Sequence, residues 1–331
     1  MSPYDVVTLG ETMLRLTPPD HLRLEQSPVL EIEVGGSESN VAVGLARLGL
    51  RVAWLSRLPR NPLGLRVSRA VAAHGVDVSR VAWADDERLG IYFVEFAAPP
   101  RDGQIIYDRR DSALSRMAPA HLPADLFQPG GARLLHLSGI TPALSASAAA
   151  TCASALQRAR EAGWLVSFDL NYRARLWSPE EARAGCEPFA LAADILIMPE
   201  RDARLIYGIA SAAPAEVTLR RLAARFPQAT LVLTQGADGA LAAHPGGQPL
   251  HQPAFPAGDV GRIGGGDAFT AGLIYGRLTA PEGADWLGLG LQWGTAAAAL
   301  KYTIPGDLPL IERAEVERLM ASAGQGPALH R

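Results

Sequence analysis

The residues best suited to chemistry lie late in the chain, where Gly264, Gly265 and Gly266 run directly into Asp267. Successive backbone amides at the start of a helix can bind an anion, and the helix dipole adds to that attraction. The carboxylate of Asp267 would lie beside a phosphate bound there and could take the proton of an attacking hydroxyl group. The alternative is a glycine-rich turn in which Asp267 only caps the helix.

A second glycine pair opens the first main helix that the sequence predicts. Gly35 and Gly36 let a ligand approach the backbone closely, and Asn40 can hydrogen-bond to sugar hydroxyl groups. Taken alone, this segment is also typical of an ordinary helix start.

Polar residues follow the predicted strand 165–170. In an extended chain Asp169, Asn171 and Arg173 would share one face at the carboxyl end of that strand. Open α/β sheets bind their ligands at this edge, and arginine grips a carboxylate or phosphate through two parallel hydrogen bonds. The alternative is a solvated loop after a strand.

Two weaker patterns complete the candidate site. Tyr107 and Arg109 alternate onto one face of a predicted strand, where they would close the site from above or simply be exposed. The strand 231–234 runs into a turn that contains Gly236 and Gly239 and could contact a nucleotide.

Strand and helix patterns alternate along the chain, which predicts an α/β fold with a doubly wound, mostly parallel sheet and helices on both faces. The predicted strands are 6–10, 52–56, 134–138, 165–170, 195–198 and 231–234, and the predicted helices are 39–48, 63–74, 145–162, 218–225, 267–277 and 287–303. Two hairpin-like insertions, 12–34 and 88–110, would pair into a small β-sheet lid. We expect one domain over residues 1–331.

Composition excludes several classes of protein. The 331 residues are 48% hydrophobic and 20% charged, with a net charge of -3 and no acidic or basic block, so neither nucleic acid nor an anionic membrane is an expected partner. Cys152 and Cys186 read as buried, reduced thiols. With no signal peptide and no apolar run of about 18 residues, we expect a cytoplasmic protein. A Walker A loop needs Gly-Lys-Ser/Thr, and this string is absent because the sole lysine, Lys301, lies between Leu300 and Tyr302.

Taken together and in this order, Gly35-Gly36…Asn40, the Gly236/Gly239 turn and the Gly264–Asp267 segment resemble the ribokinase-like (PfkB) carbohydrate kinase family over essentially the whole chain. The resemblance implies a doubly wound α/β fold with a β lid, ATP and Mg²⁺ as cofactors, Asp267 as catalytic base and the amides of Gly264, Gly265 and Gly266 as an anion hole. It also implies an ATP site that includes Thr234, Gly236, Gly239, Gly264, Gly266 and Thr295.

Within that family the chain is most similar to 2-keto-3-deoxygluconate kinases, through the segments 107–109, 136–141, 169–177 and 299–307. The resemblance implies phosphorylation of 2-keto-3-deoxygluconate to its 6-phosphate. A sugar acid suits two arginines, since its carboxylate needs cationic partners. The implied substrate-binding residues are Gly35, Gly36, Asn40, Tyr107, Arg109, Asn171, Arg173 and Asp267.

Two departures from the family pattern concern the metal. Gly261 stands where an aspartate is usual, although Asp259 is nearby. The segment 199–203 replaces an Asn-x-x-Glu motif that organises Mg²⁺ through water, with Ala203 at its last position. Glu200 and Asp202 remain as candidates for indirect contact with the ion.

Other functions stay open at this point. A fructokinase or ribokinase type would use a neutral sugar, and a sugar-binding regulator would keep the fold without the chemistry. An aldolase would need Lys301 for its Schiff base. The family resemblance also implies that the lid sheet pairs between subunits, which covers its edges, so we expect a homo-oligomer, either a dimer or a multiple of dimers.

Overall fold

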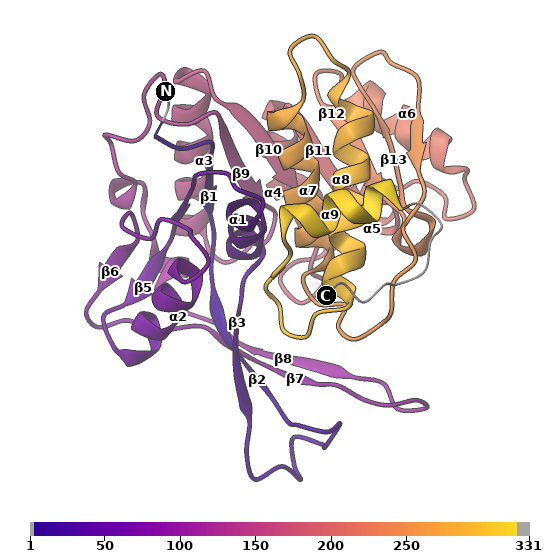
Figure 1. The fold of residues 1–331 in the computed structure, drawn as a ribbon. Coiled ribbons are helices and arrows are strands. Elements are labelled where there is room, and N and C mark those ends of the chain that lie inside the picture. Colours follow the sequence, from indigo (N-terminus) through magenta and orange to yellow (C-terminus); the bar gives the residue numbers. More distant parts are fainter. Residues whose placement is uncertain (1–2, 323–331) are drawn as a thin grey trace.

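The computed structural model describes residues 3–322, in which a large sheet is covered by helices and a small sheet projects from one end (Figure 1). The large sheet has the strand order β14-β13-β12-β11-β10-β9-β1-β4. Its strands are β1 (Val6–Leu9), β4 (Val52–Leu55), β9 (Leu134–Ser138), β10 (Leu165–Asp169), β11 (Ile195–Pro199), β12 (Thr230–Thr234), β13 (Ala240–Ala243) and β14 (Leu250–Gln252).

The central strands are parallel and buried on both faces. From β4 to β12 each neighbour pairs in parallel, whereas β13 and β14 are antiparallel. Continuous apolar runs such as 195–198 suit this position because helices cover both sides of the sheet. After β1 the chain adds β4 on one side of it and then crosses to β9 on the other side, so the direction of winding reverses between β1 and β9. The carboxyl ends of strands at such a reversal are a favoured place for a ligand.

Helices form a layer on each face of the large sheet. One apolar cluster joins the sheet to α3 (Ala146–Glu161), α4 (Pro179–Ala192), α5 (Glu200–Tyr207) and α6 (Ala215–Arg225). The other joins it to α1 (Ser37–Arg47), α2 (Pro62–Ala72), α7 (Gly265–Thr279), α8 (Trp286–Tyr302) and α9 (Arg313–Ala321). The predicted doubly wound α/β architecture is therefore confirmed.

The small sheet, here called the lid, is built from the two predicted insertions. Its strand order is β3-β2-β7-β8. The strands are β2 (Met13–Thr17), β3 (Glu31–Gly35), β7 (Ile91–Glu95) and β8 (Gln104–Asp108). Each insertion forms an antiparallel hairpin, and β2 joins the two hairpins by pairing in parallel with β7.

Several elements were not predicted from the sequence. They are α4, α5, α9, β14, the two-stranded sheet of β5 (Arg57–Pro59) and β6 (Ala82–Ala84), and the short 3-10 helices Leu114–Arg116, Pro119–His121 and Gly236–Asp238. Helix α4 contains Pro188, a residue that argues against a helix interior. These elements are short or carry weak patterns, so their formation depends on packing against the sheet.

The expected extended run over 169–173 was wrong. Strand β10 ends at Asp169, and Asn171 adopts a left-handed backbone with φ 41°. Asparagine tolerates this conformation better than most residues, and here its side chain gains a hydrogen bond to Ser37. Asp169, Asn171 and Arg173 therefore do not share a strand face.

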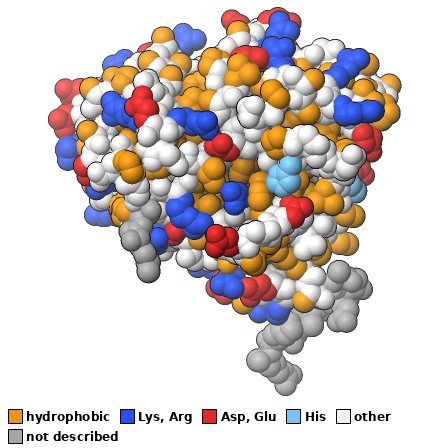
Figure 2. Space-filling view, turned by 90° about the horizontal axis from the view of Figure 1, so that it is seen from above, with side chains coloured by type: hydrophobic (Ala, Val, Ile, Leu, Met, Phe, Trp, Pro, Cys, Tyr) orange, Lys and Arg blue, Asp and Glu red, His pale blue; other side chains and the backbone are white. Residues whose placement is uncertain are grey.

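Figure 2 shows one face of the molecule, on which basic and acidic side chains are interspersed rather than gathered by sign. No helix within residues 3–322 is long and apolar enough to cross a membrane. Cys152 and Cys186 are buried free thiols, as the sequence predicted.

Candidate active site

A cleft of about 1120 Å³ lies between the carboxyl edge of the large sheet and the lid. The large sheet and its helices contribute Asp169, Asn171, Thr234, Gly264, Gly266 and Asp267, and the lid contributes Tyr92 and Tyr107. Most residues that the sequence singled out, from five separate segments, thus meet in one cavity.

Asp267 lies in the first turn of α7 and is held by the start of α1. Ser37 Oγ donates to one carboxylate oxygen over 2.8 Å, and Asn40 Nδ2 donates to the other over 2.7 Å. Burial raises the pKa of Asp267, whereas these two hydrogen bonds oppose the rise. The carboxylate is therefore fixed in orientation and more basic than an exposed aspartate.

Asn171 extends this hydrogen-bonded chain. Its Nδ2 donates to Ser37 Oγ over 2.7 Å, so one line of hydrogen bonds runs from Asn171 through Ser37 to Asp267. The left-handed backbone at Asn171 makes this contact, since an extended chain would carry the side chain away from α1.

The glycines before Asp267 form the N-terminus of α7. Gly264 has φ 82° and caps the helix, and the amide of Gly265 donates to the Arg262 carbonyl over 3.2 Å. Gly264 and Gly266 line the cleft, where amides of the first helical turn lack an intrahelical acceptor. The segment can therefore bind an anion next to Asp267.

Gly35 and Gly36 are required by close packing. A Cβ atom on Gly35 would overlap the carboxylate of Asp307 and the hydroxyl of Tyr92, and one on Gly36 would overlap the Glu11 carbonyl. Backbone, rather than side chains, thus forms this wall of the cleft.

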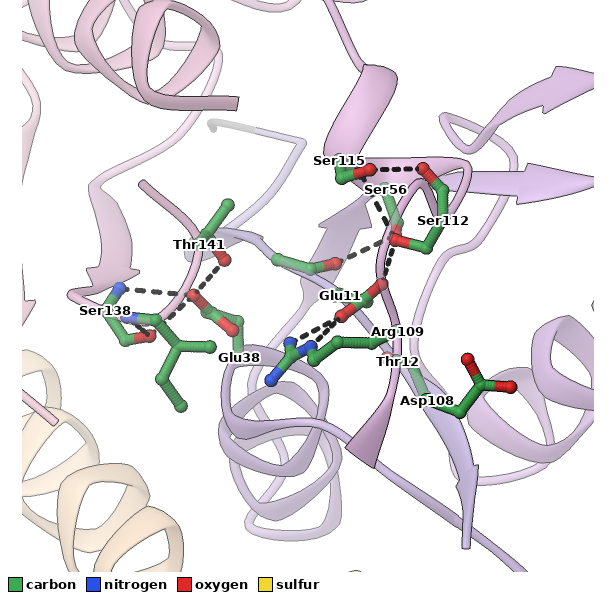
Figure 3. Close-up of polar contacts among 12 residues, drawn as sticks. Glu11, Thr12, Glu38, Ser56, Asp108, Arg109, Ser112, Ser115, Ser138 and Thr141 are labelled. Carbon is green, nitrogen blue, oxygen red and sulfur yellow. Dashed lines mark hydrogen bonds and ion pairs between the residues drawn. The ribbon is translucent and has the colours of Figure 1, made fainter. Parts of the chain in front are cut away.

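Arg109 lines the cleft but already has a carboxylate partner. Its Nε donates to Glu11 Oε2 over 2.8 Å, its Nη2 donates to the same oxygen, and Ser112 Oγ donates to the other oxygen (Figure 3). Both charged side chains are largely buried, with 10% of Arg109 and 4% of Glu11 exposed. The guanidinium also lies 5.6 Å from the ring centre of Tyr107.

Arg173 differs from Arg109 because, among the residues that the structure describes, it donates hydrogen bonds to the backbone carbonyls of Asn171 and Tyr172 alone. Within residues 3–322, no ion pair involves Arg173. Arg110 and Arg175 also line the cleft and are exposed. The free cationic charge at this end of the cleft therefore comes from residues other than Arg109.

Two further carboxylates lie at the floor of the cleft. Glu38 is buried and accepts hydrogen bonds from the hydroxyls of Ser138 and Thr141, each over 2.8 Å (Figure 3). Burial raises its pKa. Burial and the charge of Asp267 also raise the pKa of Asp169, to about 7. The floor is thus a cluster of buried acids, in which the charge of Asp267 adds to burial in raising the pKa of both Glu38 and Asp169.

Comparison with known proteins identifies this arrangement. The model of the pfkB family of carbohydrate kinases matches residues 4–310. The chain belongs to this family. It is therefore a phosphotransferase that acts on a sugar hydroxyl group, and kinases of this family use ATP.

Individual relatives cover nearly the whole carbohydrate kinase. The chain is similar to a 2-dehydro-3-deoxygalactonokinase of Haloferax volcanii, with 44% identity over 97% of this chain and 98% of the relative. It is 31% identical to a 2-dehydro-3-deoxygluconokinase of Bacillus subtilis, over 92% and 91% of the two chains. The crystal structure of a 2-dehydro-3-deoxygluconokinase of Thermotoga maritima superposes with a TM-score of 0.88 and 35% identity, over 96% and 98% of the two chains.

The residues expected at the nucleotide lie at different depths in this kinase. Thr234, at the carboxyl end of β12, lines the cleft. Gly236 and Gly239 form the following turn with φ 62° and 97°, outside the residues that line the cleft. Thr295 is buried within α8, where its hydroxyl donates to the Leu291 carbonyl over 2.9 Å.

The candidate metal contacts are tied to protein partners. Glu200 binds Arg204 and the amide of Gln235, and Asp202 is buried beside Arg201. Asp259 pairs with Arg262 on the surface loop that precedes the anion-binding glycines. Within residues 3–322, no group of three His, Cys, Asp or Glu side chains is arranged to hold a metal.

Sequence reasoning missed five residues that the fold brings to the site: Glu11, Ser37, Glu38, Tyr92 and Asp307. Ser37 and Glu38 lie inside a segment already singled out, but a helix start gives no reason to choose them. Glu11 carried one usable signal, since it is a charged residue two positions beyond an apolar strand whose carboxyl end faces the ligand edge.

Proposed function

We propose that this kinase transfers the γ-phosphoryl group of ATP to the terminal hydroxyl group of a 2-keto-3-deoxy sugar acid. One cleft holds a base beside an anion-binding helix start and also Arg173, which pairs with no carboxylate of residues 3–322, and this observation supports the proposal most directly. A sugar acid would bring its carboxylate to that arginine and its far hydroxyl to Asp267.

In the reaction we propose, the hydroxyl oxygen of the sugar attacks the γ-phosphorus of ATP. A new P–O bond forms, the bond to the β-phosphate oxygen breaks, ADP leaves, and the hydroxyl proton passes to Asp267. Ser37 and Asn40 hold the carboxylate in the orientation that accepts the proton. The amides of the Gly264–Gly266 turn stabilise the charge that develops on the phosphoryl oxygens.

ATP would bind along Thr234 and the Gly236/Gly239 turn, with its phosphates at the start of α7. Mg²⁺ would neutralise the phosphates, and it commonly binds through one or two carboxylates, waters and the phosphates themselves rather than in an all-protein cage. Glu200 and Asp202, in the first turn of α5, supply carboxylates near this edge of the sheet. Glu200, just beyond β11, would contact the ion through water.

Two sugar acids, epimeric at one carbon, are the leading substrates. We predicted the gluconate form from the sequence, whereas the relative with 44% identity is named for the galactonate form. A coupled ADP-release assay with Mg-ATP would compare 2-dehydro-3-deoxygluconate, 2-dehydro-3-deoxygalactonate, fructose and ribose. Preference for either acid supports the proposal, and preference for a neutral sugar would overturn the assignment of an acid substrate.

Replacement of arginines at the cleft tests how the acid is recognised. We expect Arg173→Ala to raise KM for the sugar acid about tenfold or more, because a charge-assisted contact is lost. The exposed Arg183→Ala, on α4, is the control and should leave KM unchanged. Equal KM values in all three proteins would mean that Arg173 does not bind the carboxylate.

We also propose a homo-oligomer formed through the lid, in the cytoplasm, where ATP is available. Ile32, Leu16, Phe93 and Ile106 lie opposite one another in register across the lid, and Ile32 and Ile106 are 43% and 44% exposed. An apolar row of this kind suits burial against a second copy. Sedimentation of Ile106→Glu would test this, since the substitution should shift an oligomer toward monomer.

A further inference from the structure

The sole lysine of the chain is buried at the end of α8. Lys301 has no exposed surface, and its Nζ donates to the carbonyls of Ile304 over 2.8 Å and Gly306 over 3.0 Å. No ion pair of residues 3–322 includes it. Burial lowers the pKa of Lys301 and the nearby charge of Asp307 opposes that fall, so the charge of a carboxylate that makes no hydrogen bond to it only partly offsets the cost of burying the ammonium group.

The end of the Lys301 side chain lies next to Gly264, the first of the anion-binding glycines. A Cβ atom on Gly264 would come within 3.4 Å of Lys301 Cε and would overlap the Asp307 carbonyl. A Cβ atom on Gly265 would overlap the ring of Tyr302. The end of α8 and the loop after it thus form the back wall of the N-terminus of α7.

The same end of α8 also restrains the loop that precedes the glycines. The amides of Val260 and Gly261 donate to the Tyr302 carbonyl over 2.9 and 3.1 Å. These contacts and the packing of Asp307 against Gly264 attach both sides of the anion-binding turn to residues 302–307. The geometry of that turn therefore depends on how firmly residues 302–307 are held.

An ordinary helix cap is the simpler explanation of Lys301. Lysines near a helix C-terminus often hydrogen-bond to the last carbonyls and interact favourably with the helix dipole. Such lysines are usually solvated, however, and touch only their own helix end. Lys301 is fully buried, and the end of its side chain lies next to the cap residue of a second helix, the one that carries Asp267.

We propose that Lys301 is a positioning residue for phosphoryl transfer, acting as a built-in cation. Its ammonium group gathers the carbonyls of Ile304 and Gly306 and so keeps residues 302–307 against Gly264. The positive charge also lies behind the place where the phosphates of ATP would bind, in a region shielded from solvent. This inference rests on the proposed kinase function.

The proposal has a consequence for ion dependence. Carbonyl oxygens that hold an ammonium group can also replace the hydration shell of a potassium ion. The wild-type enzyme should therefore need no added monovalent cation. A variant that lacks the lysine side chain should keep the carbonyls of Ile304 and Gly306 and gain a site for K⁺ or NH₄⁺.

The test compares Lys301→Ala, Lys301→Met and the control Arg313→Met, which removes one positive charge from the surface of α9. Activity would be measured at equal concentrations of tetramethylammonium, potassium and ammonium chloride. We expect the wild type and the control to be equally active in all three salts. In tetramethylammonium chloride both Lys301 variants should lose about ten- to a hundredfold in kcat, with little change in KM for the sugar, because the anion-binding turn is displaced.

Ion-specific recovery separates positioning from simple stability. Lys301→Ala should regain several-fold in kcat with K⁺ or NH₄⁺, while Lys301→Met, whose side chain fills the space, should not. Wild-type kcat in a folded Lys301→Ala would overturn the proposal. So would an equal loss in every salt accompanied by a lower melting temperature, since Lys301 would then be only a structural cap.

A second readout avoids dependence on the sugar. ATP affinity of the same proteins, measured by calorimetry in the three salts, should be weakened in Lys301→Ala and restored by K⁺ or NH₄⁺. A wild type that binds ATP but phosphorylates none of the sugars would reject the proposed function and leave Lys301 testable. If Lys301→Ala left both the ATP affinity and kcat unchanged, the proposal that Lys301 acts as a built-in cation would be wrong.

Discussion

The large sheet and the lid are held by different forces. In the large sheet, strands such as β9 and β11 are buried on both faces by two apolar clusters. The lid's own buried apolar cluster consists of Met13, Tyr92 and Val94, and only Leu14 and Val34 at its base belong to a large cluster. The free energy gained from burying apolar surface grows with the buried area, so most of this stabilisation comes from the large sheet and its helices.

The base of the lid joins the rest of the molecule through this apolar packing and also through buried polar contacts. Arg15 on β2 pairs with Asp307, and Arg109, just beyond β8, pairs with Glu11. Both pairs are buried, and both border the cleft. We infer that the large sheet and its helices fix the position of Asp267, whereas the lid can move when the cleft binds a ligand.

The largest loss of turnover is expected from a substitution of Asp267, which belongs to the large sheet and its helices. Asp267→Asn keeps the hydrogen-bonding shape but removes the base, so kcat should fall by about 10²–10⁴-fold. The exposed Asp85→Asn is the matched control and should retain activity. Steady-state kinetics checks this, and wild-type turnover in Asp267→Asn would end its assignment as base.

The same substitution in each region tests how unequally they are stabilised. Val166 on β10 is fully buried, and Val94 on β7 is 3% exposed. We expect Val166→Ala to lower the free energy of unfolding by about 2–3 kcal/mol, because two methyl groups and a cavity are involved. Val94→Ala should cost about 1 kcal/mol or less, since the lid contributes little to global unfolding.

Urea denaturation would measure both values. Equal losses in the two variants would contradict the view that the lid unfolds locally and apart from the large sheet.

The lid contact to Arg109 should affect sugar binding more than turnover. Glu11→Gln keeps an acceptor but removes the charge that holds the Arg109 side chain in the wall of the cleft, so the cleft should change shape and KM for the sugar acid should rise about tenfold while kcat changes less. The control is Asp108→Asn, which removes a negative charge next to Arg109 in the chain. Asp108 forms an exposed ion pair with Arg88, so this substitution should leave KM unchanged. Equal KM values in the two variants would show that Glu11 does not position Arg109.

The smallest expected effect is a change in how stability depends on pH. The pKa of Asp169 is raised to about 7, chiefly by burial. A raised carboxyl pKa stabilises the fold fully below the unfolded value of about 3.9, and that stabilisation is lost as pH rises through 7. Asp169→Asn should therefore lose less stability than the wild type between pH 5 and pH 8.

Melting temperatures across that range would measure the change. Glu38 and Asp267, whose pKa values are also raised, keep part of the dependence in the variant. Parallel curves for the two proteins would contradict the raised pKa of Asp169.

Local patterns predicted the parts of the site that lie within single segments. The glycines before Asp267 predicted a helix start that binds anions, and Gly35-Gly36…Asn40 predicted the other helix start at the cleft. Alternation failed at 169–173, since it assumes an extended chain and cannot foresee a left-handed residue held by a distant side chain.

The sequence by itself determined the α/β class, the two insertions and Asp267, because each depends on hydrophobic period or on a run of neighbouring residues. Only the tertiary structure decided the partners. Asp267 meets Ser37 across 230 positions, and Arg15 meets Asp307 across 292. Such pairs depend on the order of the strands in the sheet and on the position of the lid over it. Neither can be predicted from the intervals between residues in the sequence.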